Sequence, residues 1–283
     1  MTSILLWAAA LAAAPAPTRH VRADLVSEVE SVRAGTPFEV GLLLRMSPGW
    51  HTYWRNPGDS GLATRLVWTL PEGFHAGPIE WPYPRTFSQG PVTSYGYEGE
   101  VLLGVAITPP ASLPAGAHVS LGARVDWLEC REACLPGRAE LTLVLPVRSE
   151  PSAPAPAWAG AFAEARRRLP GDGRGWTLFA RETADRWVLV IRPPRAEGPL
   201  RTAYFFPERG QVLEHAAPQK LARGRDSYRL ELLPAPNAPR GELLTGVLVV
   251  ETAGGRTAAV RVDATIDGRG GKPAASASTA PRP

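Results

Sequence analysis

Cysteine, lysine and long apolar runs are all scarce in this sequence of 283 residues. Among its 31 basic residues only Lys220 and Lys272 are lysines, which we attribute to genome composition rather than to function. A membrane-spanning helix needs about 18 or more consecutive apolar residues. The longest apolar stretch after the N-terminal region, Leu243–Val250, is short and is interrupted by Thr245 and Gly246. The sequence therefore predicts no membrane span in the mature chain.

A concentrated basic face is also missing, although the whole chain has a net charge of +4. Residues 24–148 hold 9 arginines against 13 acidic residues, and residues 149–267 hold 17 basic against 14 acidic residues. Nucleic-acid binding depends on Lys and Arg clustered on one face, so we expect no nucleic-acid partner. The sequence also has no nucleotide-binding glycine fingerprint and no Gly-x-Ser-x-Gly nucleophile elbow.

The N-terminal region predicts export. Residues 4–14 (ILLWAAALAAA) are too short to span a bilayer and have the length of a signal-peptide core, although the three residues before them contain no Lys or Arg. Small residues before Asp24 predict cleavage between Ala23 and Asp24. We expect residues 1–23 to be a signal peptide, the mature chain to be periplasmic, and residues 268–283 to be a disordered tail. The alternative for the N-terminal region is a disordered leader rich in Ala and Pro.

The body of the chain has the pattern of two all-β domains. Its 30 prolines and 28 glycines favour short strands joined by turns. A stretch rich in Pro, Ser and Ala at 149–158 is expected to be a linker between residues 24–148 and 159–267. Both parts have the short apolar runs of a β-sandwich. The expected strands are 38–44, 65–70, 100–107, 119–127, 139–147, 176–181, 186–192, 200–206, 227–233, 242–252 and 257–266. Trp158–Leu169 is expected to be one short helix at the start of the second domain, with Phe162 and Ala165 on one face.

The two cysteines, Cys130 and Cys134, are separated by three residues. In an exported chain such a pair is expected to form a disulfide. As a staple it would close a loop of about five residues and stabilise the fold by roughly 2 kcal/mol, less than a bond between distant strands. Neighbouring thiols also suit exchange, in which one sulfur is attacked and the other resolves the mixed disulfide. The pair is expected at a sandwich rim, where strand 119–127 ends and Pro136-Gly137 turns the chain. Redox exchange, a structural staple and metal binding all remain open from spacing alone.

Three stretches around these cysteines are distinctive: GWHTYWRNPGDSGLATRLVW (49–68), WPYPRTFSQGPVTSYGYEGEVLL (81–103) and WLECREACLPGRAELTLVLPV (127–147). They resemble the N-terminal periplasmic domain of the DsbD family of thiol:disulfide interchange proteins. AYFFPERGQVLEHAAPQ (203–219) resembles the further β-domain of longer members, such as those linked to copper tolerance. The resemblance implies immunoglobulin-like β-sandwiches, the first of which has a redox-active cysteine pair.

The same resemblance implies roles for individual residues. Cys134 would be the thiol exposed to partners and Cys130 the resolving thiol, in a protein-disulfide reductase that needs no cofactor. Electrons would pass from a membrane hub to periplasmic thioredoxin-fold partners, in processes such as cytochrome c biogenesis. The 283 residues contain no membrane domain or thioredoxin-like domain, so either a separate hub supplies the electrons or the redox role has changed. The family shields its cysteines with an aromatic cap loop, and the matching residues are Tyr95 and, less well placed, Tyr97, with Gly96 allowing a bend.

The neighbouring charges predict thiols of ordinary acidity. Arg131 favours a thiolate, whereas Glu129 and Glu132 oppose it. The segment 51–54 is expected to be a loop in which His51 is hydrogen-bonded rather than a ligand, and His215 is isolated in sequence and suggests no role. Two other functions compete with thiol exchange: Cu(I) binding by the same thiols, and a non-catalytic interaction module with a stapled loop.

Overall fold

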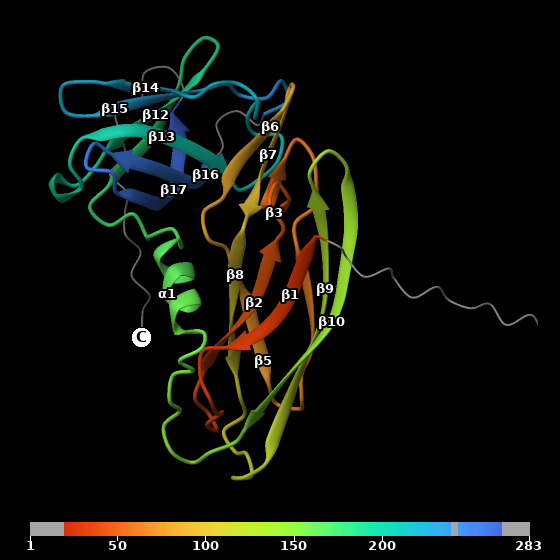
Figure 1. Cartoon of the computed structure of the whole chain (residues 1–283). Helices are drawn as coiled ribbons and strands as arrows, with labels where there is room; N and C mark the ends of the chain where they lie inside the picture. The colour runs from red at the N-terminus through yellow and green to blue at the C-terminus, as the bar shows by residue number, and fades with distance from the viewer. Residues whose placement is uncertain (1–19, 239–242, 268–283) are drawn as a thin grey trace, which may run out of the picture.

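The structure, a computed structural model, describes residues 20–238 and 243–267, and its regular structure is almost entirely β-strand (Figure 1). The strands are β1 (Val21–Ser27), β2 (Phe38–Met46), β3 (His51–Gly58), β4 (Arg65–Thr69), β5 (His75–Glu80), β6 (Arg85–Gln89), β7 (Val92–Glu98), β8 (Glu100–Thr108), β9 (His118–Cys130), β10 (Cys134–Pro146), β11 (Thr177–Glu182), β12 (Trp187–Arg192), β13 (Leu200–Pro207), β14 (Lys220–Arg223), β15 (Tyr228–Leu232), β16 (Leu243–Thr252) and β17 (Thr257–Asp267). The helix α1 (Ala159–Arg167) and a 3₁₀ turn (Arg195–Glu197) complete the regular structure of these residues. None of their helices is long and apolar enough to cross a membrane.

The first ten strands form a β-sandwich. One sheet has the order β1-β2-β8-β5 and the other β10-β9-β3-β7-β6, with β4 also paired to β9. The strands β2 and β8 are apolar on nearly every residue because the inner face of their sheet meets the sandwich core and part of the outer face is covered by α1. The core residues include Val40, Val105 and Leu121, all fully buried. An all-β chain with a first sandwich domain is thus confirmed.

Five strands of this sandwich are absent from the expected set: β1, β3, β5, β6 and β7. The strand β3 explains the difficulty, because Thr52, Tyr53 and Trp54 are buried in succession and the strand ends in Asn-Pro-Gly. A run without polar–apolar alternation and with turn residues resembles a loop. The expectation of a loop at 51–54 is therefore wrong, since these residues lie on a strand inside a sheet.

The hairpin β9–β10 also differs from expectation at its turn. Its two strands pair over 13 positions, from Cys134 opposite Cys130 to Pro146 opposite His118. The chain turns at residues 131–133, and Pro136 and Gly137 lie within β10. Since β10 is at the edge of its sheet, a proline there leaves no internal ladder bond unmade. The cysteines consequently sit at the very end of a long paired hairpin.

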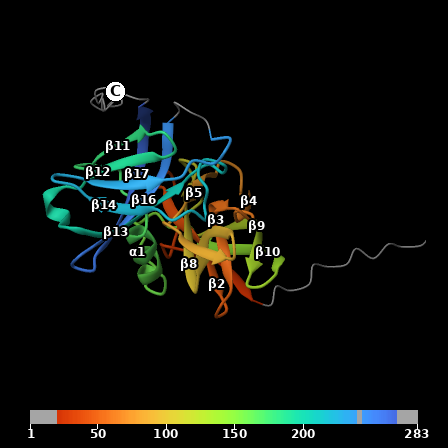
Figure 2. The same cartoon turned by 90° about the horizontal axis from the view of Figure 1, so that it is seen from above.

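The second sandwich contains seven strands in the order β13-β16-β17-β11-β12-β15-β14. Its strands fold over one apolar core that includes Leu189, Phe205, Leu230 and Leu248, each fully buried. The parallel pairing of β11 with β17 joins the three strands β13, β16 and β17 to the four strands β11, β12, β15 and β14. The two sandwiches lie side by side in Figures 1 and 2, and the second is next to the end of the first that carries the turn between β9 and β10.

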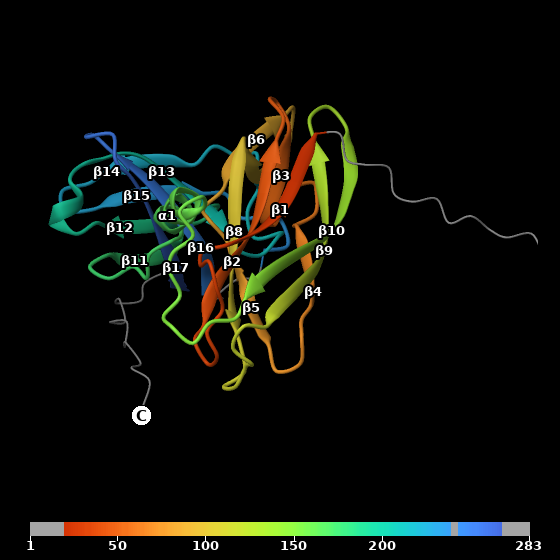
Figure 3. The same cartoon turned by 60° about the horizontal axis from the view of Figure 1, so that its bottom comes forward.

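The helix α1 packs on the first sandwich; it lies beside β8 in Figure 1, and Figure 3 shows it with the bottom of the molecule brought forward. Phe162 is fully buried against Leu43 and Leu102, which lie on β2 and β8. The preceding segment is also tied to the first sandwich, since the N–H of Glu30 donates to the carbonyl of Ala153 at 3.0 Å. The proposed boundary between 148 and 159 remains a prediction. The contacts of α1 lead us to move it to the residues after the helix.

Candidate functional site

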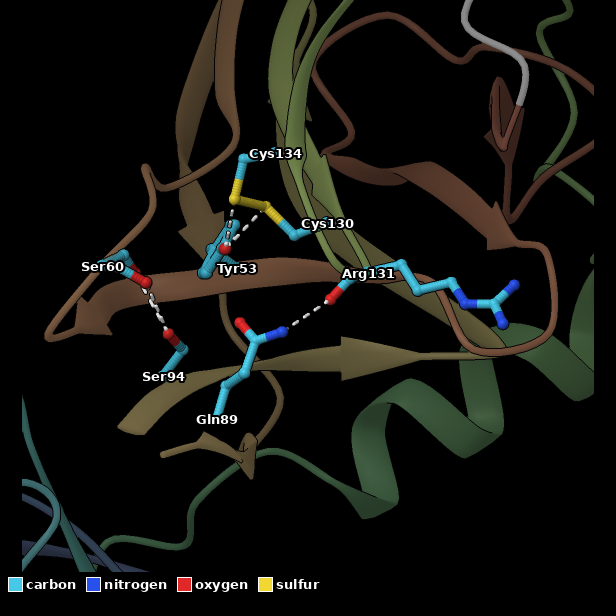
Figure 4. The surroundings of a disulfide bond; sticks show 7 residues. All are labelled: Tyr53, Ser60, Gln89, Ser94, Cys130, Arg131 and Cys134. Carbon is cyan, nitrogen blue, oxygen red and sulfur yellow. Dashed lines mark hydrogen bonds between the residues drawn. A yellow bond between two sulfur atoms is a disulfide. The ribbon is translucent and has the colours of Figure 1, made fainter. Parts of the chain in front are cut away.

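A disulfide joins Cys130 at the end of β9 to Cys134 at the start of β10 (Figure 4). The two residues face each other across the hairpin, so their side chains are brought together by the register of the strands. Cys130 is 3% exposed, whereas Cys134 is an exposed residue. The bond therefore joins one buried cysteine to one exposed cysteine.

Tyr53 of β3 lies directly beneath the bond. Its hydroxyl donates a hydrogen bond to Cys130 Sγ at 2.8 Å and is 3.2 Å from Cys134 Sγ. Burial raises the pKa of this phenol, and a hydrogen bond with Ser60 opposes the shift. The group stays protonated at neutral pH and can donate to whichever sulfur carries negative charge.

The loop after β3 holds the Tyr53 ring in place. A Cβ built on Gly61 would be 2.2 Å from the ring, and Gly61 has φ of +101°, so only glycine fits there. Beside it the Ser60 and Ser94 hydroxyls are 3.0 Å apart, which joins this loop to β7. The loop that contains Ser60 and Gly61 therefore packs against the Tyr53 ring.

A cavity of about 240 Å³ opens beside the disulfide. Aromatic and polar side chains line it: the ring of Phe87 stacks on His51 with centroids 4.4 Å apart, and His51 meets Tyr53 edge to face. Burial lowers the pKa of His51, while Glu98 opposes the shift. The lining is completed by Gly49, Ser60, Ser88, Gln89, Val92, Ser94, Arg131 and Glu132. The β6–β7 hairpin, with Phe87, thus forms one wall of the site.

The charged neighbours act differently from the sequence-based expectation. The side chain of Arg131 extends away from the sulfurs (Figure 4) and passes over Gly49. Its carbonyl accepts a hydrogen bond from Gln89 at 3.5 Å. Glu129 is buried and accepts a hydrogen bond from the Trp127 indole at 3.3 Å. The nearest donor to the sulfurs is therefore a neutral hydroxyl rather than a guanidinium.

Tyr95 and Tyr97, the expected cap residues, are not at the disulfide. Both are almost fully buried; Tyr95 contacts the rings of Tyr204 and Phe206, and the Tyr97 hydroxyl donates to the carbonyl of Pro82 at 2.7 Å. Successive side chains of a strand point to opposite faces. Ser94 of the same strand lines the cavity, so neither Tyr95 nor Tyr97, one and three residues further on, shares its side of the strand. Gly96 lies within the strand, where a Cβ would be 1.9 Å from the Thr52 carbonyl oxygen.

Sequence reasoning missed Tyr53 and Phe87 as site residues. The signal for Phe87 was the turn sequence Gly90-Pro91 shortly after it, which marks a hairpin. No local signal could identify Tyr53, because it is 77 residues away from Cys130 in the sequence. In the stretches that the structure describes, no group of three or more His, Cys, Asp or Glu side chains is placed to hold a metal ion.

The pairing of β9 with β10 argues against a purely structural role for the disulfide. The bond closes a three-residue turn between strands that already pair over 13 positions. In the chain-entropy model so short a loop gains roughly 2 kcal/mol. The ladder already holds these strands together, so the bond adds little to their association.

Comparison with known proteins finds, for the first sandwich, the same family that its sequence resembles. Residues 21–146 match the family described as thiol:disulfide interchange protein DsbD, N-terminal. This match confirms the resemblance seen in the sequence. The comparison with curated proteins gave no match.

Solved structures extend the similarity of fold to the second sandwich. The N-terminal periplasmic domain of ScsB from Proteus mirabilis is 17% identical, with a TM-score of 0.65, and the match covers 88% of this chain and 95% of that one. The E. coli chaperone DraB is 11% identical and covers 86% of this chain and 97% of its own, but its TM-score of 0.22 supports no argument. The arrangement of both sandwiches is thus shared with a solved periplasmic domain.

Proposed function

We propose that this chain, whose residues 21–146 match the DsbD N-terminal family, is a periplasmic protein that exchanges thiols and disulfides with thioredoxin-fold partners. The observation that carries the proposal is a disulfide between an exposed residue, Cys134, and a buried residue, Cys130, with both sulfurs within hydrogen-bond distance of the Tyr53 hydroxyl. A thiolate of a partner protein can attack the disulfide at Cys134, and the buried Cys130 can then re-form it.

The exchange proceeds in two balanced steps. In the reduced protein the Cys134 thiolate attacks a partner disulfide, forming a mixed disulfide and releasing one partner thiolate. The Cys130 thiolate then attacks Cys134 Sγ, which re-forms the intramolecular bond and releases the second partner thiolate. Two electrons pass to the partner, and the steps run in reverse when the oxidised protein receives electrons.

Tyr53 would assist the thiol that carries charge in each step. A hydrogen bond to the ionised form of a group favours that form. In reverse exchange the Cys130 thiolate is the leaving group, and the phenol lies 2.8 Å from that sulfur. Donation from Tyr53 therefore stabilises the leaving thiolate without a nearby positive side chain.

The surface around Cys134 suits a protein partner. Leu135, beside Cys134, is 42% exposed, and Leu62, beside Gly61, is 65% exposed. Exposed apolar side chains around a reactive bond provide contact area for docking. A separate membrane protein would complete the electron path.

A redox titration tests the proposal directly. We expect the Cys130–Cys134 pair to equilibrate with a glutathione buffer at a potential above about −300 mV, because structural disulfides typically lie below that value. The measurement is alkylation of free thiols followed by mass spectrometry after equilibration. A potential below that limit would favour the interaction module with a stapled loop, and copper bound by the reduced protein would favour the copper alternative.

Export is a separate prediction, and the structure refines the cleavage site. The strand β1 begins at Val21, which is 3% exposed and pairs with Met46. Cleavage between Ala23 and Asp24 would remove three residues of that strand. We therefore expect N-terminal sequencing of periplasmic protein to find a mature chain that retains Val21. A chain starting at Asp24 would support the sequence-based site, and intact Met1 in the cytosol would contradict export.

A further inference from the structure

The Tyr95 and Tyr204 hydroxyls of the two sandwiches are 3.5 Å apart, and a further set of polar contacts joins the second sandwich to one short part of the first, residues 55–59 at the end of β3. The side-chain amide of Asn56 donates to the carbonyls of Pro207 and Arg209 at 2.8 and 3.2 Å. Arg55 forms an ion pair with Glu208. These partners lie at the end of β13 and in the loop that follows it.

The third contact is the closest to the redox site. His215 Nδ1 is 2.9 Å from Asp59 Oδ1, and the His215 side chain is 4% exposed. The other carboxylate oxygen of Asp59 accepts a hydrogen bond from the Thr93 N–H at 2.8 Å. Asp59 thus links the second sandwich to the loop after β3 and to β7 at the same time.

Burial of His215 at this position lowers the stability of the fold. Its Nε2 atom has no hydrogen-bond partner among the residues that the structure describes. A buried polar atom without a partner destabilises a fold. The ring packs edge to face on Tyr95 at 5.1 Å between centroids, which an apolar residue could do without that cost. The contact with Asp59 is what the polar side chain of His215 supplies here.

The anchored loop is the one that holds Tyr53. Asp59 is followed by Ser60, which approaches Ser94, and by Gly61, which lies against the Tyr53 ring. Tyr53 in turn reaches both sulfurs. A continuous series of contacts therefore runs from His215 through residues 59–61 to the disulfide.

We propose that the second sandwich is a positioning element for the redox site: His215, by holding Asp59, fixes the loop that places the Tyr53 hydroxyl against the cysteine sulfurs. His215 touches neither sulfur and acts through Tyr53. The proposal deepens the proposed function by giving the second domain a role in tuning the same thiols.

The test measures the acidity of one thiol without any partner protein. In a Cys130→Ser background, the rate of alkylation of Cys134 by iodoacetamide is followed against pH, and its midpoint reports thiolate formation. Tyr53→Phe should raise the midpoint because the donor is lost. His215→Phe keeps the ring packing but removes the contact with Asp59. It should raise the midpoint by about half a pH unit, a threefold loss of thiolate within the range of known long-range couplings.

Three further variants make the result specific. His215→Asn retains a donor near the Nδ1 position and should restore the midpoint. Asn56→Ala breaks the second anchor and should raise it, which keeps the test usable if His215→Phe fails to fold. Tyr228→Phe is the matched control, since it removes a buried hydrogen bond to the Leu200 N–H within the second sandwich, away from the loop; it should leave the midpoint unchanged.

Several outcomes would overturn the proposal. The first two are an unchanged midpoint in Tyr53→Phe and an unchanged midpoint in both His215→Phe and Asn56→Ala. The other two are a midpoint shift in His215→Asn, or in the control Tyr228→Phe, that equals the shift in His215→Phe. Because iodoacetamide replaces the partner, failure of thiol exchange with other proteins would leave this result intact. Conversely, a negative result here would leave the exchange function standing.

Discussion

Replacing Cys130 by serine should trap the protein in a mixed disulfide with its partner, whereas replacing Cys134 should not. Cys134 is the exposed residue of the pair and Cys130 the buried one, so we expect a partner to meet Cys134 first. Without Cys130 no neighbouring thiol can resolve the complex. The measurement is a non-reducing gel of acid-quenched, alkylated extracts, on which the trapped complex is a band that disappears on reduction.

Cys130→Ser and Cys134→Ser are matched controls, because both lose the disulfide and they differ only in which thiol remains. Trapping by Cys134→Ser alone would reverse the assigned roles. If neither variant traps a partner and each merely loses about 2 kcal/mol of stability, the bond is a staple. The double variant, which has no thiol in the described site, should give no reducible band.

Truncation of Phe162 should cause a large loss of stability in the first sandwich. The side chain is fully buried on β2 and β8, and replacing a core Phe by Ala typically costs about 3–5 kcal/mol. For the same reason a shortened chain of residues 20–148, which lacks α1, should unfold at lower denaturant concentration than one of residues 20–169. Urea unfolding followed by tryptophan fluorescence measures both effects.

Val144→Ala provides the control for this prediction, because Val144 lies in the same sandwich and is 55% exposed. Its substitution should change the free energy of unfolding by less than about 0.5 kcal/mol. Equal stability of the two shortened chains would place the domain boundary before the helix, as the sequence suggests.

Patterns within short segments of the sequence were enough to predict part of this fold. Alternating apolar residues and frequent turn residues predict an all-β chain, and β8, β9, β12 and β16 lie close to their expected positions. The cysteine pair and its surrounding stretch were enough to recognise the resemblance to the DsbD N-terminal family, which residues 21–146 match. The helix was also predicted, because its apolar face repeats with the period of one helical turn.

Which residues meet at the disulfide depends on how the strands pair and pack in three dimensions. Tyr53 reaches the sulfurs only because β3 and β9 are neighbours in one sheet, and Tyr95 and Tyr97 point away because of the side on which their strand places them. A shift of one residue in strand register would exchange these faces. His215 meets Asp59 across 156 residues of sequence. Such contacts arise from the packing of whole domains, and no local pattern in the sequence encodes them.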